Sequence, residues 1–337
     1  MNENILLGHG SGGKLTHNLI SNLFVKHFSN PILEKQTDSA ILEINANNIS
    51  FTTDSFVVDP LFFNGGDIGK LAVAGTVNDL AVSGAEPLFL SASFIIEEGF
   101  SFSELEKIVK SMAEEAKKAN IKIVTGDTKV VDRGKCDKVF INTSGIGILS
   151  EKNKEISSGE KIEIGDKIII NGTIGDHGMA IMATRNDMNF SSNIKSDCAS
   201  LNQLIKKVID SGADIKFMRD ATRGGLSTVL CEIVENKSYG IEINEDDLAV
   251  NENVRGICEL LGFDPVYVAN EGKVVMVVSN KDSEKVLAIL KKDELGKASS
   301  IIGEVVDEHH GKGWINTEIG GKRIIDMLAG EQLPRIC

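Results

Sequence analysis

The chain has 337 residues, 42% of them hydrophobic and 25% charged, and its formal net charge at pH 7 is −13. A chain of this length suits two domains better than one core. Lysines alternate with glutamates and form no basic stripe, so we expect no nucleic-acid partner. No apolar run approaches the roughly 20 residues that cross a bilayer, so we also expect no membrane span.

The five cysteines are odd in number, widely spaced and without a CxxC pair: Cys136, Cys198, Cys231, Cys258 and Cys337. This pattern predicts reduced thiols in a cytoplasmic protein, with no disulfide framework and no zinc knuckle. Cys337 is the last residue of the sequence. Taken alone, a terminal cysteine indicates only a frayed end.

In the first half, strand-like and helical runs alternate. The strand-like runs cover residues 39–44, 49–58, 88–96, 121–126 and 138–149. Residues 66–87 predict a helix with Asp67 as its N-cap. Residues 101–120 predict a second helix, in which Ser103 and Glu106 form a capping box.

The pattern becomes polar and rich in Gly and Ser near residues 150–165, where we place a domain boundary. The expected units are residues 1–155, residues 156–320, and a C-terminal helix with a flexible tail over 321–337. In the second unit the expected strands are 167–172, 240–243, 273–278 and 298–306. The expected helices begin near 176 and cover 198–212, 224–236, 252–262, 283–292 and 323–330. Hairpin-like strand pairs without a clean βαβ order predict an α+β fold with mixed sheets.

The stretch "GHGSGGK" at residues 8–14 is the strongest local signal near the N-terminus. It fits G-x-G-x-x-G, but too few residues precede it for the buried strand of a dinucleotide fold. It nearly fits a P-loop, but Leu15 stands where a magnesium-binding Ser or Thr is needed. Its backbone N–H groups and Lys14 suit an anion. The alternative is a flexible segment.

Five aspartates share a setting of small or polar neighbours: Asp38, Asp54, Asp79, Asp127 and Asp220. Asp79 falls in the middle of a predicted helix, where Asp is a poor helix former, and its helical neighbours are small. Any single aspartate of this kind can be a cap or a turn residue. Together with an anion loop, they predict Mg²⁺ held by a few carboxylates and by substrate phosphates.

Two further stretches run through glycine turns into helix starts, "NGTIGDHG" at 171–178 and "RDATRGGL" at 219–226. Both are geometries that favour anions. His177 in the first is either a turn residue or a base. Glu271 stands just before a strand that reads as buried. His309 stands in a loop with no third metal ligand nearby, so we expect no metal at His309.

Together these stretches resemble the HypE family of hydrogenase maturation proteins, the carbamoyl dehydratases. The similarity rests on "GHGSGGK", "TDSFVVDP", "GDIGKLAVAGTVNDLAVSGAEP", "VTGDTK", "NGTIGDHG", "RDATRGGL", "ANEGK" and the terminal "PRIC". The wider superfamily includes aminoimidazole ribonucleotide synthetase, selenophosphate synthetase and thiamine-phosphate kinase. The resemblance implies their two-domain fold, a homodimer formed through the N-terminal β-sheet, and ATP bound between the domains and across the dimer.

The resemblance also implies a reaction. The carbamoyltransferase HypF would load a carbamoyl group onto Cys337, and ATP would drive its dehydration to a thiocyanate. The cyano group would then pass to iron on a HypC–HypD complex. Glu271 would be the base and Lys129 the polarising cation. The nucleotide contacts implied are Gly10, Ser11, Gly12, Gly13, Lys14, Asp54, Asn78, Asp79, Gly126 and Asp127. The Mg²⁺ ligands implied are Asp38, Asp54, Asp79, Asp127 and Asp220.

Two alternatives stay open at this point. A small-molecule kinase or synthetase of the same superfamily is one, although the glycine-rich loop lacks the cysteine that selenophosphate synthetases place there. A non-catalytic carrier whose tail docks on partners is the other, but it leaves the five aspartates unexplained.

Overall fold

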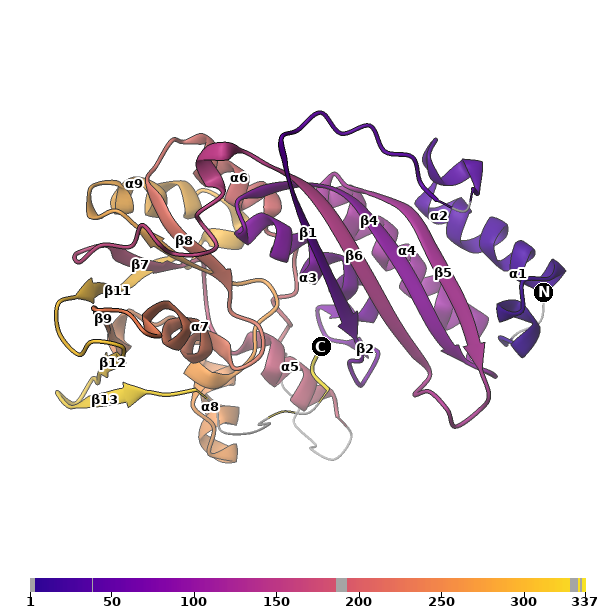
Figure 1. The fold of residues 1–337 in the computed structure, drawn as a ribbon. Helices are drawn as coiled ribbons and strands as arrows, with labels where there is room; N and C mark the ends of the chain where they lie inside the picture. The colour runs from indigo at the N-terminus through magenta and orange to yellow at the C-terminus, as the bar shows by residue number, and fades with distance from the viewer. Residues whose placement is uncertain (1–3, 38, 186–192, 328–332, 334) are drawn as a thin grey trace.

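The computed structural model describes residues 4–37, 39–185, 193–327, 333 and 335–337. Within these ranges the chain forms a four-stranded sheet of order β1-β6-β4-β5 and a seven-stranded sheet of order β13-β12-β9-β11-β7-β10-β8. Figure 1 shows the N-terminal sheet and the C-terminal sheet in separate halves of the molecule, with helices packed on each. The mixed α+β class expected from the sequence is confirmed.

The N-terminal sheet is built from β1 (Asn48–Phe56), β4 (Ala85–Glu97), β5 (Lys122–Val131) and β6 (Val139–Leu149). Only the β4–β5 pair is parallel among these strands. A short hairpin of β2 (Phe62–Phe63) and β3 (Gly66–Asp67) leads into the helix α3 (Ile68–Val82). The helices α3 and α4 (Phe102–Ala119) cover one face of the sheet, and side chains on its other face are exposed.

The C-terminal sheet contains β7 (Lys167–Ile170), β8 (Ile215–Asp220), β9 (Gly240–Asn244), β10 (Val274–Val278), β11 (Ser300–Val306), β12 (Gly313–Asn316) and β13 (Lys322–Ile325). Its helices are α5 (Asp176–Thr184), α6 (Asn202–Asp210), α7 (Gly225–Val234), α8 (Glu252–Leu261) and α9 (Asn280–Leu290). All five residues of β10 are buried, which explains why this strand reads as a continuous apolar run. The loop that holds Glu271 leads into this strand, which lies between β7 and the edge strand β8.

Near the N-terminus, α1 (Lys14–Leu19), η2 (Ile20–Val25) and α2 (Lys26–Phe28) follow one another without a break as one helical segment. Short helical turns fill other connections: η1 (Leu7–Gly10), η3 (Leu33–Lys35), η4 (Glu151–Asn153), η5 (Glu245–Asp247), η6 (Pro265–Tyr267) and η7 (Glu294–Gly296). The glycine-rich loop at 8–14 lies against β5, since a Cβ on Gly10 would be 2.4 Å from the Val130 nitrogen. Figure 1 places the N-terminus at the outer edge of the N-terminal sheet and the C-terminus between the two halves.

Helix α3 is the central element, and its composition follows from its position. Asp67 is its N-cap as predicted, and Oδ1 accepts hydrogen bonds from the Gly69 and Lys70 nitrogens at 2.7 and 3.0 Å. Nearly every residue of the helix is buried, because it packs on β1 and β6, on α4, and on α6 and β8 of the other half. Small residues allow this close approach: a Cβ on Gly75 would lie 2.9 Å from the Phe56 ring.

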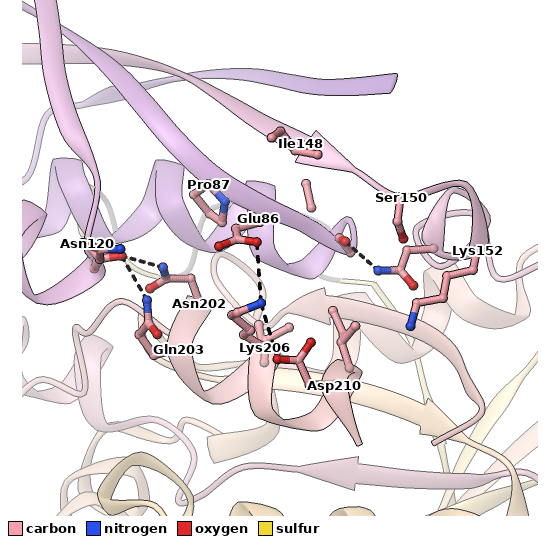
Figure 2. A pocket seen from close by; sticks show the side chains of 16 residues that line it. Glu86, Pro87, Asn120, Ile148, Ser150, Lys152, Asn202, Gln203, Lys206 and Asp210 are labelled. Atoms are coloured by element: carbon pink, nitrogen blue, oxygen red, sulfur yellow. Dashed lines mark hydrogen bonds and ion pairs between the residues drawn. The ribbon is translucent and has the colours of Figure 1, made fainter. Parts of the chain in front are cut away.

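The segment before and within α6 joins the two halves. Asn78 on α3 accepts a hydrogen bond from the Leu201 nitrogen at 2.7 Å and donates to the Ala199 and Glu271 carbonyls. Figure 2 shows the next part of this junction, where Lys206 lies between Glu86 and Asp210 at 3.5 and 3.4 Å. The Asn78 amide is used within the chain, so the structure supports a structural role for it and gives no support to a nucleotide contact.

Three local expectations were wrong. Residues 39–44 form no strand, because no neighbouring strand in the described part of the chain pairs with them, and Ile41 is 80% exposed. Helix α4 begins after Ser101 without a side-chain cap, and Glu106 pairs instead with Lys110 and His27.

The third concerns the expected helix at 323–330. Lys322–Ile325 is the strand β13, paired with β12, and residues 328–330 lie outside the described residues. Among the helices that the structure describes, none has both the length and the apolar character needed to cross a membrane.

Candidate active site

The C-terminal tail is docked in the structure. The tail segment, meaning here Leu333 and Arg335–Cys337, lies along the residues that follow β1. The Val57 nitrogen donates to a Cys337 oxygen and the Asp59 nitrogen to the Arg335 carbonyl, both at 3.1 Å. Arg335 donates from Nε to the Val57 carbonyl at 3.0 Å and forms an ion pair with Asp137. These contacts differ from the freely flexible tail that the sequence suggested.

Docking brings Cys337 within electrostatic reach of Glu271. Burial raises the pKa of the Cys337 thiol to about 12, and the charge of Glu271 adds to the effect. Glu271 is only 3% exposed. Burial raises its pKa well above the ordinary value, and the charges of Asp197 and Asp220 raise it further. A buried carboxylate with a raised pKa and the partly buried thiol of Cys337 therefore lie in one site.

The turn that carries Glu271 is held by a buried ion pair. Asp197 accepts from the Glu271 and Gly272 nitrogens at 3.1 and 3.0 Å, and its carboxylate lies 2.9 Å from Lys273 Nζ. Burial alone would raise the pKa of Asp197, but the charges of Lys273 and His177 and the hydrogen bonds from Lys273 and the Glu271 nitrogen together hold that pKa below its usual value. The sequence held no signal for Asp197, because its partners lie more than 70 residues away.

Three of the predicted aspartates come together in an acidic cluster of Asp54, Asp79 and Asp220. Asp79 accepts a hydrogen bond from Thr52 at 2.8 Å. Burial raises the pKa of Asp54 and of Asp79. Burial, with the charge of Asp79, raises the pKa of Asp220 to about 7. A bound cation would offset the repulsion between carboxylates that lie this close together. Asp79 and Asp220 line a cavity of about 420 Å³.

Arg223 is one of the cations that this chain supplies to the site; Arg219 is another, and its charge acts on Asp79 and Asp220. The charge of Arg223 opposes the raised pKa values of Asp54, Glu271 and Cys337. Arg223 is followed by Gly224 and Gly225 with φ of 75° and 62°, a left-handed turn that starts α7. A Cβ on Gly225 would also lie 2.6 Å from the Val268 carbonyl oxygen. Sequence reasoning identified this turn as favourable to anions but gave Arg223 no role.

A second group of predicted residues lies elsewhere on the same chain. Asp127 and Lys129 are paired in register with Ser93 and Ile95, so their side chains are on the exposed face of the N-terminal sheet. They form an ion pair at 2.7 Å with both side chains about 60% exposed, and the Lys129 hydrogen bond lowers the pKa of Asp127. Gly126 is required by packing, because a Cβ there would lie 2.1 Å from the Ala92 oxygen.

The glycine-rich loop belongs with this second group, because it packs on the same strand β5. Its predicted contact residues Ser11, Gly12, Gly13 and Lys14 are exposed. Within one chain, the loop and Lys129 are therefore separated from the acidic cluster, Glu271 and Cys337. Asp38 lies outside the described residues.

A separate group of possible metal ligands involves His309. Within the described ranges, Glu242, Glu308 and His309 have ligand atoms within 4.8 Å of one another. Sequence reasoning therefore missed Glu242 and Glu308 as possible partners of His309. Glu242 already pairs with Lys322 at 2.5 Å and with His309 at 3.4 Å. These ion pairs explain the cluster without a metal.

Comparison with known proteins places this chain in a family. Residues 36–149 match the model of the AIR synthase related protein N-terminal domain, and residues 163–316 match that of the C-terminal domain. The chain is 48% identical over 332 residues to carbamoyl dehydratase HypE of Bradyrhizobium diazoefficiens, covering 98% of this chain and 95% of that protein. This chain belongs to the HypE family. The resemblance seen in the sequence is confirmed.

Two solved structures of HypE relatives add to this. HypE in complex with ATP superimposes with a TM-score of 0.93 at 46% identity, covering 98% of this chain and 99% of that one. HypE from a HypE–HypF complex superimposes with a TM-score of 0.80 at 52% identity, covering 92% and 99%. The expected two-domain architecture of this superfamily is therefore shown for this member of the HypE family.

Proposed function

We propose that this protein is an ATP-dependent carbamoyl dehydratase that works on its own C-terminus. Cys337 carries a carbamoyl group, which is dehydrated to a thiocyanate that supplies the cyanide ligand for the iron of [NiFe]-hydrogenase. The observation that carries this proposal is the docked tail, which brings the Cys337 thiol to the buried Glu271. A non-catalytic carrier needs no such site at the position of its thiol.

The chemistry follows from the leaving group. The carbamoyl oxygen is a poor leaving group until it takes the γ-phosphoryl group of ATP. Departure of phosphate and loss of both protons from the nitrogen then leave a C≡N group on sulfur, with ADP and phosphate as the other products. Glu271 is the base, and a pKa raised by burial makes its carboxylate a stronger proton acceptor than an ordinary one. Arg223 is placed to stabilise the negative charge that develops on oxygen.

The acidic cluster fits Mg²⁺. Asp54, Asp79 and Asp220 are crowded and partly desolvated, and their carboxylate oxygens are the ligands that Mg²⁺ prefers. Their ligand atoms do not all lie within 4.8 Å of one another, so the three carboxylates do not converge on one point. Mg²⁺ commonly binds one or two carboxylates together with substrate phosphates, and this arrangement agrees with that. The cation would neutralise charge on the phosphates of ATP, as in other phosphoryl transfer sites.

We infer that a complete site needs two copies of the chain. The exposed face of the N-terminal sheet carries Ile49 and Phe51 of the edge strand β1, 55% and 66% exposed, and Asp127 and Lys129 of the opposite edge strand β5. Covering this face with a second copy buries the apolar side chains. The same contact can bring Asp127, Lys129 and the glycine-rich loop of one copy toward the acidic cluster and Glu271 of the other. In this homodimer, ATP lies between the domains and across the interface.

The partners follow from the reaction. HypF is proposed as the donor of the carbamoyl group, which the solved complex of HypF with a relative supports. A HypC–HypD complex is proposed as the acceptor of the cyano group, and the cytoplasm as the location. Because both partners must reach Cys337, the tail has to leave its docked position in each cycle.

Intact-mass spectrometry tests the proposal. The chain is incubated with HypF and carbamoyl phosphate, and then with ATP and Mg²⁺. We expect a carbamoyl adduct that loses one water when ATP is added. Cys337→Ala should gain no adduct, whereas the control Cys136→Ala, which changes another partly exposed thiol, should behave as the wild type. An adduct of equal yield on Cys337→Ala would overturn the proposal.

A further inference from the structure

His177 joins the docked tail to the C-terminal half of the molecule. It lies in the first turn of α5, and its side chain is completely buried. Its ring nitrogen Nε2 is 2.6 Å from the Ile336 carbonyl oxygen, and Nδ1 is 2.8 Å from Ser196 Oγ. Both ring nitrogens are therefore used, one of them by the tail itself.

The surrounding hydrogen bonds define the tautomer. The Ile336 carbonyl can only accept, so Nε2 of His177 must be the donor, and Nδ1 then accepts the proton of Ser196 Oγ, which itself accepts from the Cys198 nitrogen at 3.1 Å. The ring proton of the neutral form is therefore on Nε2. Burial lowers the pKa of His177, which favours this neutral form, although the charge of Asp197 opposes the shift.

The rest of this helix turn is shaped to receive the tail. The Phe63 ring meets the His177 ring edge to face, with centroids 5.5 Å apart. A Cβ on Gly178 would lie 3.0 Å from Leu333 Cδ1, so glycine allows the tail to pack on the helix. Asp176 is engaged by Thr173 and by Asn251. The stretch that read as an anion site therefore contacts the tail instead.

The two ends of the contact determine where the thiol lies. The Ile336 carbonyl is held by His177 on one side, and a Cys337 terminal oxygen is held by the Val57 nitrogen on the other. These groups flank the Cα of Cys337. With both held, the Cys337 side chain has little freedom except rotation about its own Cα–Cβ bond.

We propose that His177 is a positioning residue: its hydrogen bond to the Ile336 carbonyl sets the docked register of the tail and so presents the Cys337 thiol to Glu271. The inference rests on the proposed function for its chemical consequence. The docking contact itself does not depend on that function, so the two can be tested apart.

Alkylation of the unmodified full-length chain tests the contact directly. Loss of the donor in His177→Phe leaves a buried carbonyl unpaired, so the released tail should be more populated. We expect Cys337 to react with iodoacetamide about tenfold faster, which corresponds to about 1.4 kcal/mol. His177→Gln keeps a donor and an acceptor on one side chain and should stay within about threefold of the wild type.

Other cysteines in the same sample separate tail release from a structural fault. Cys198 is buried two residues from Ser196, and Cys258 is buried in the same core. Both should remain unreactive in His177→Phe. Equal Cys337 rates in His177→Phe and the wild type would overturn the inference. So would a rise at Cys198 that matches the rise at Cys337.

A second readout concerns the reaction. With HypF present, His177→Phe should accept the carbamoyl group at least as fast as the wild type but dehydrate it more slowly. Dehydration of the variant at the wild-type rate would contradict the positioning role. If the wild type itself were never carbamoylated, the proposed function would fail while the alkylation result would still decide the docking contact.

Discussion

Replacing Asp197 by alanine tests how the turn that carries Glu271 is held. Asp197 and Lys273 are 5% and 9% exposed, and their charges are 2.9 Å apart. The substitution leaves the Lys273 ammonium buried without its counter-ion. It also removes the acceptor of two backbone N–H groups, those of Glu271 and Gly272.

The expected cost is large. Breaking a buried ion pair from one side destabilises a protein by about 3–5 kcal/mol, and a typical domain has only about 5–15 kcal/mol in all. The pKa of Asp197 is lowered in the folded chain, so the contribution of the pair is fully present above the unfolded-state pKa of about 3.9 and is lost as the pH falls through the folded pKa. At neutral pH the full effect should be seen.

Urea denaturation at pH 7, followed by circular dichroism, measures this loss. The double variant Asp197→Ala with Lys273→Met is the matched control, because it removes the uncompensated charge and keeps an apolar stem. We expect it to recover most of the stability. A single-variant loss below about 1 kcal/mol, or a double variant less stable than the single one, would refute this account of the turn.

Three further predictions concern the docked tail, the exposed face of the N-terminal sheet, and the active site that we propose is shared between two copies of the chain. Because burial raises the pKa of Cys337 to about 12, its alkylation rate should still rise above pH 9, where a free thiol with a pKa of about 8.5 levels off; a plateau at pH 9 would contradict docking. Phe51→Asp, on the exposed sheet face, should abolish self-association in sedimentation velocity, whereas Ile319→Asp, at a 95% exposed position beyond β12, should leave it unchanged. Asp79→Asn and Asp127→Asn should each lose ATP-dependent dehydration. Mixing the two variants should restore part of it, since one shared site in a mixed dimer is intact; no recovery after confirmed subunit exchange would argue against a site shared between copies.

The parts of the fold that carry local signals were predictable. Helix α3 was read from Asp67 and from its run of small apolar residues, and both features were found as expected. The run at 39–44 and the strand Lys322–Ile325 were misread because strand formation depends on a pairing partner, which a local pattern does not reveal.

The site shows the same division between local and distant information. Glu271 and Cys337 were selected from the sequence through the family resemblance, and the structure brings them together. Asp197 and the tail contact of His177 were missed, because their hydrogen bonds join residues 74 and 159 positions apart. The sequence analysis grouped Asp127 and Lys129 of β5 with the aspartates of the acidic cluster. The alternation of side chains along β5 places both residues on the opposite face of the sheet.

The most direct test of the central claim is single-turnover dehydration by Glu271→Gln. The substitution is isosteric, and the hydrogen bonds of this residue that hold the turn come from its backbone. The variant is carbamoylated by HypF, ATP is added, and intact mass is followed with time. The account predicts that the carbamoyl adduct on Cys337 persists, with loss of water at least about 100-fold slower than in the wild type. Loss of water at the wild-type rate would contradict the claim that Glu271 is the base acting on the group carried by Cys337.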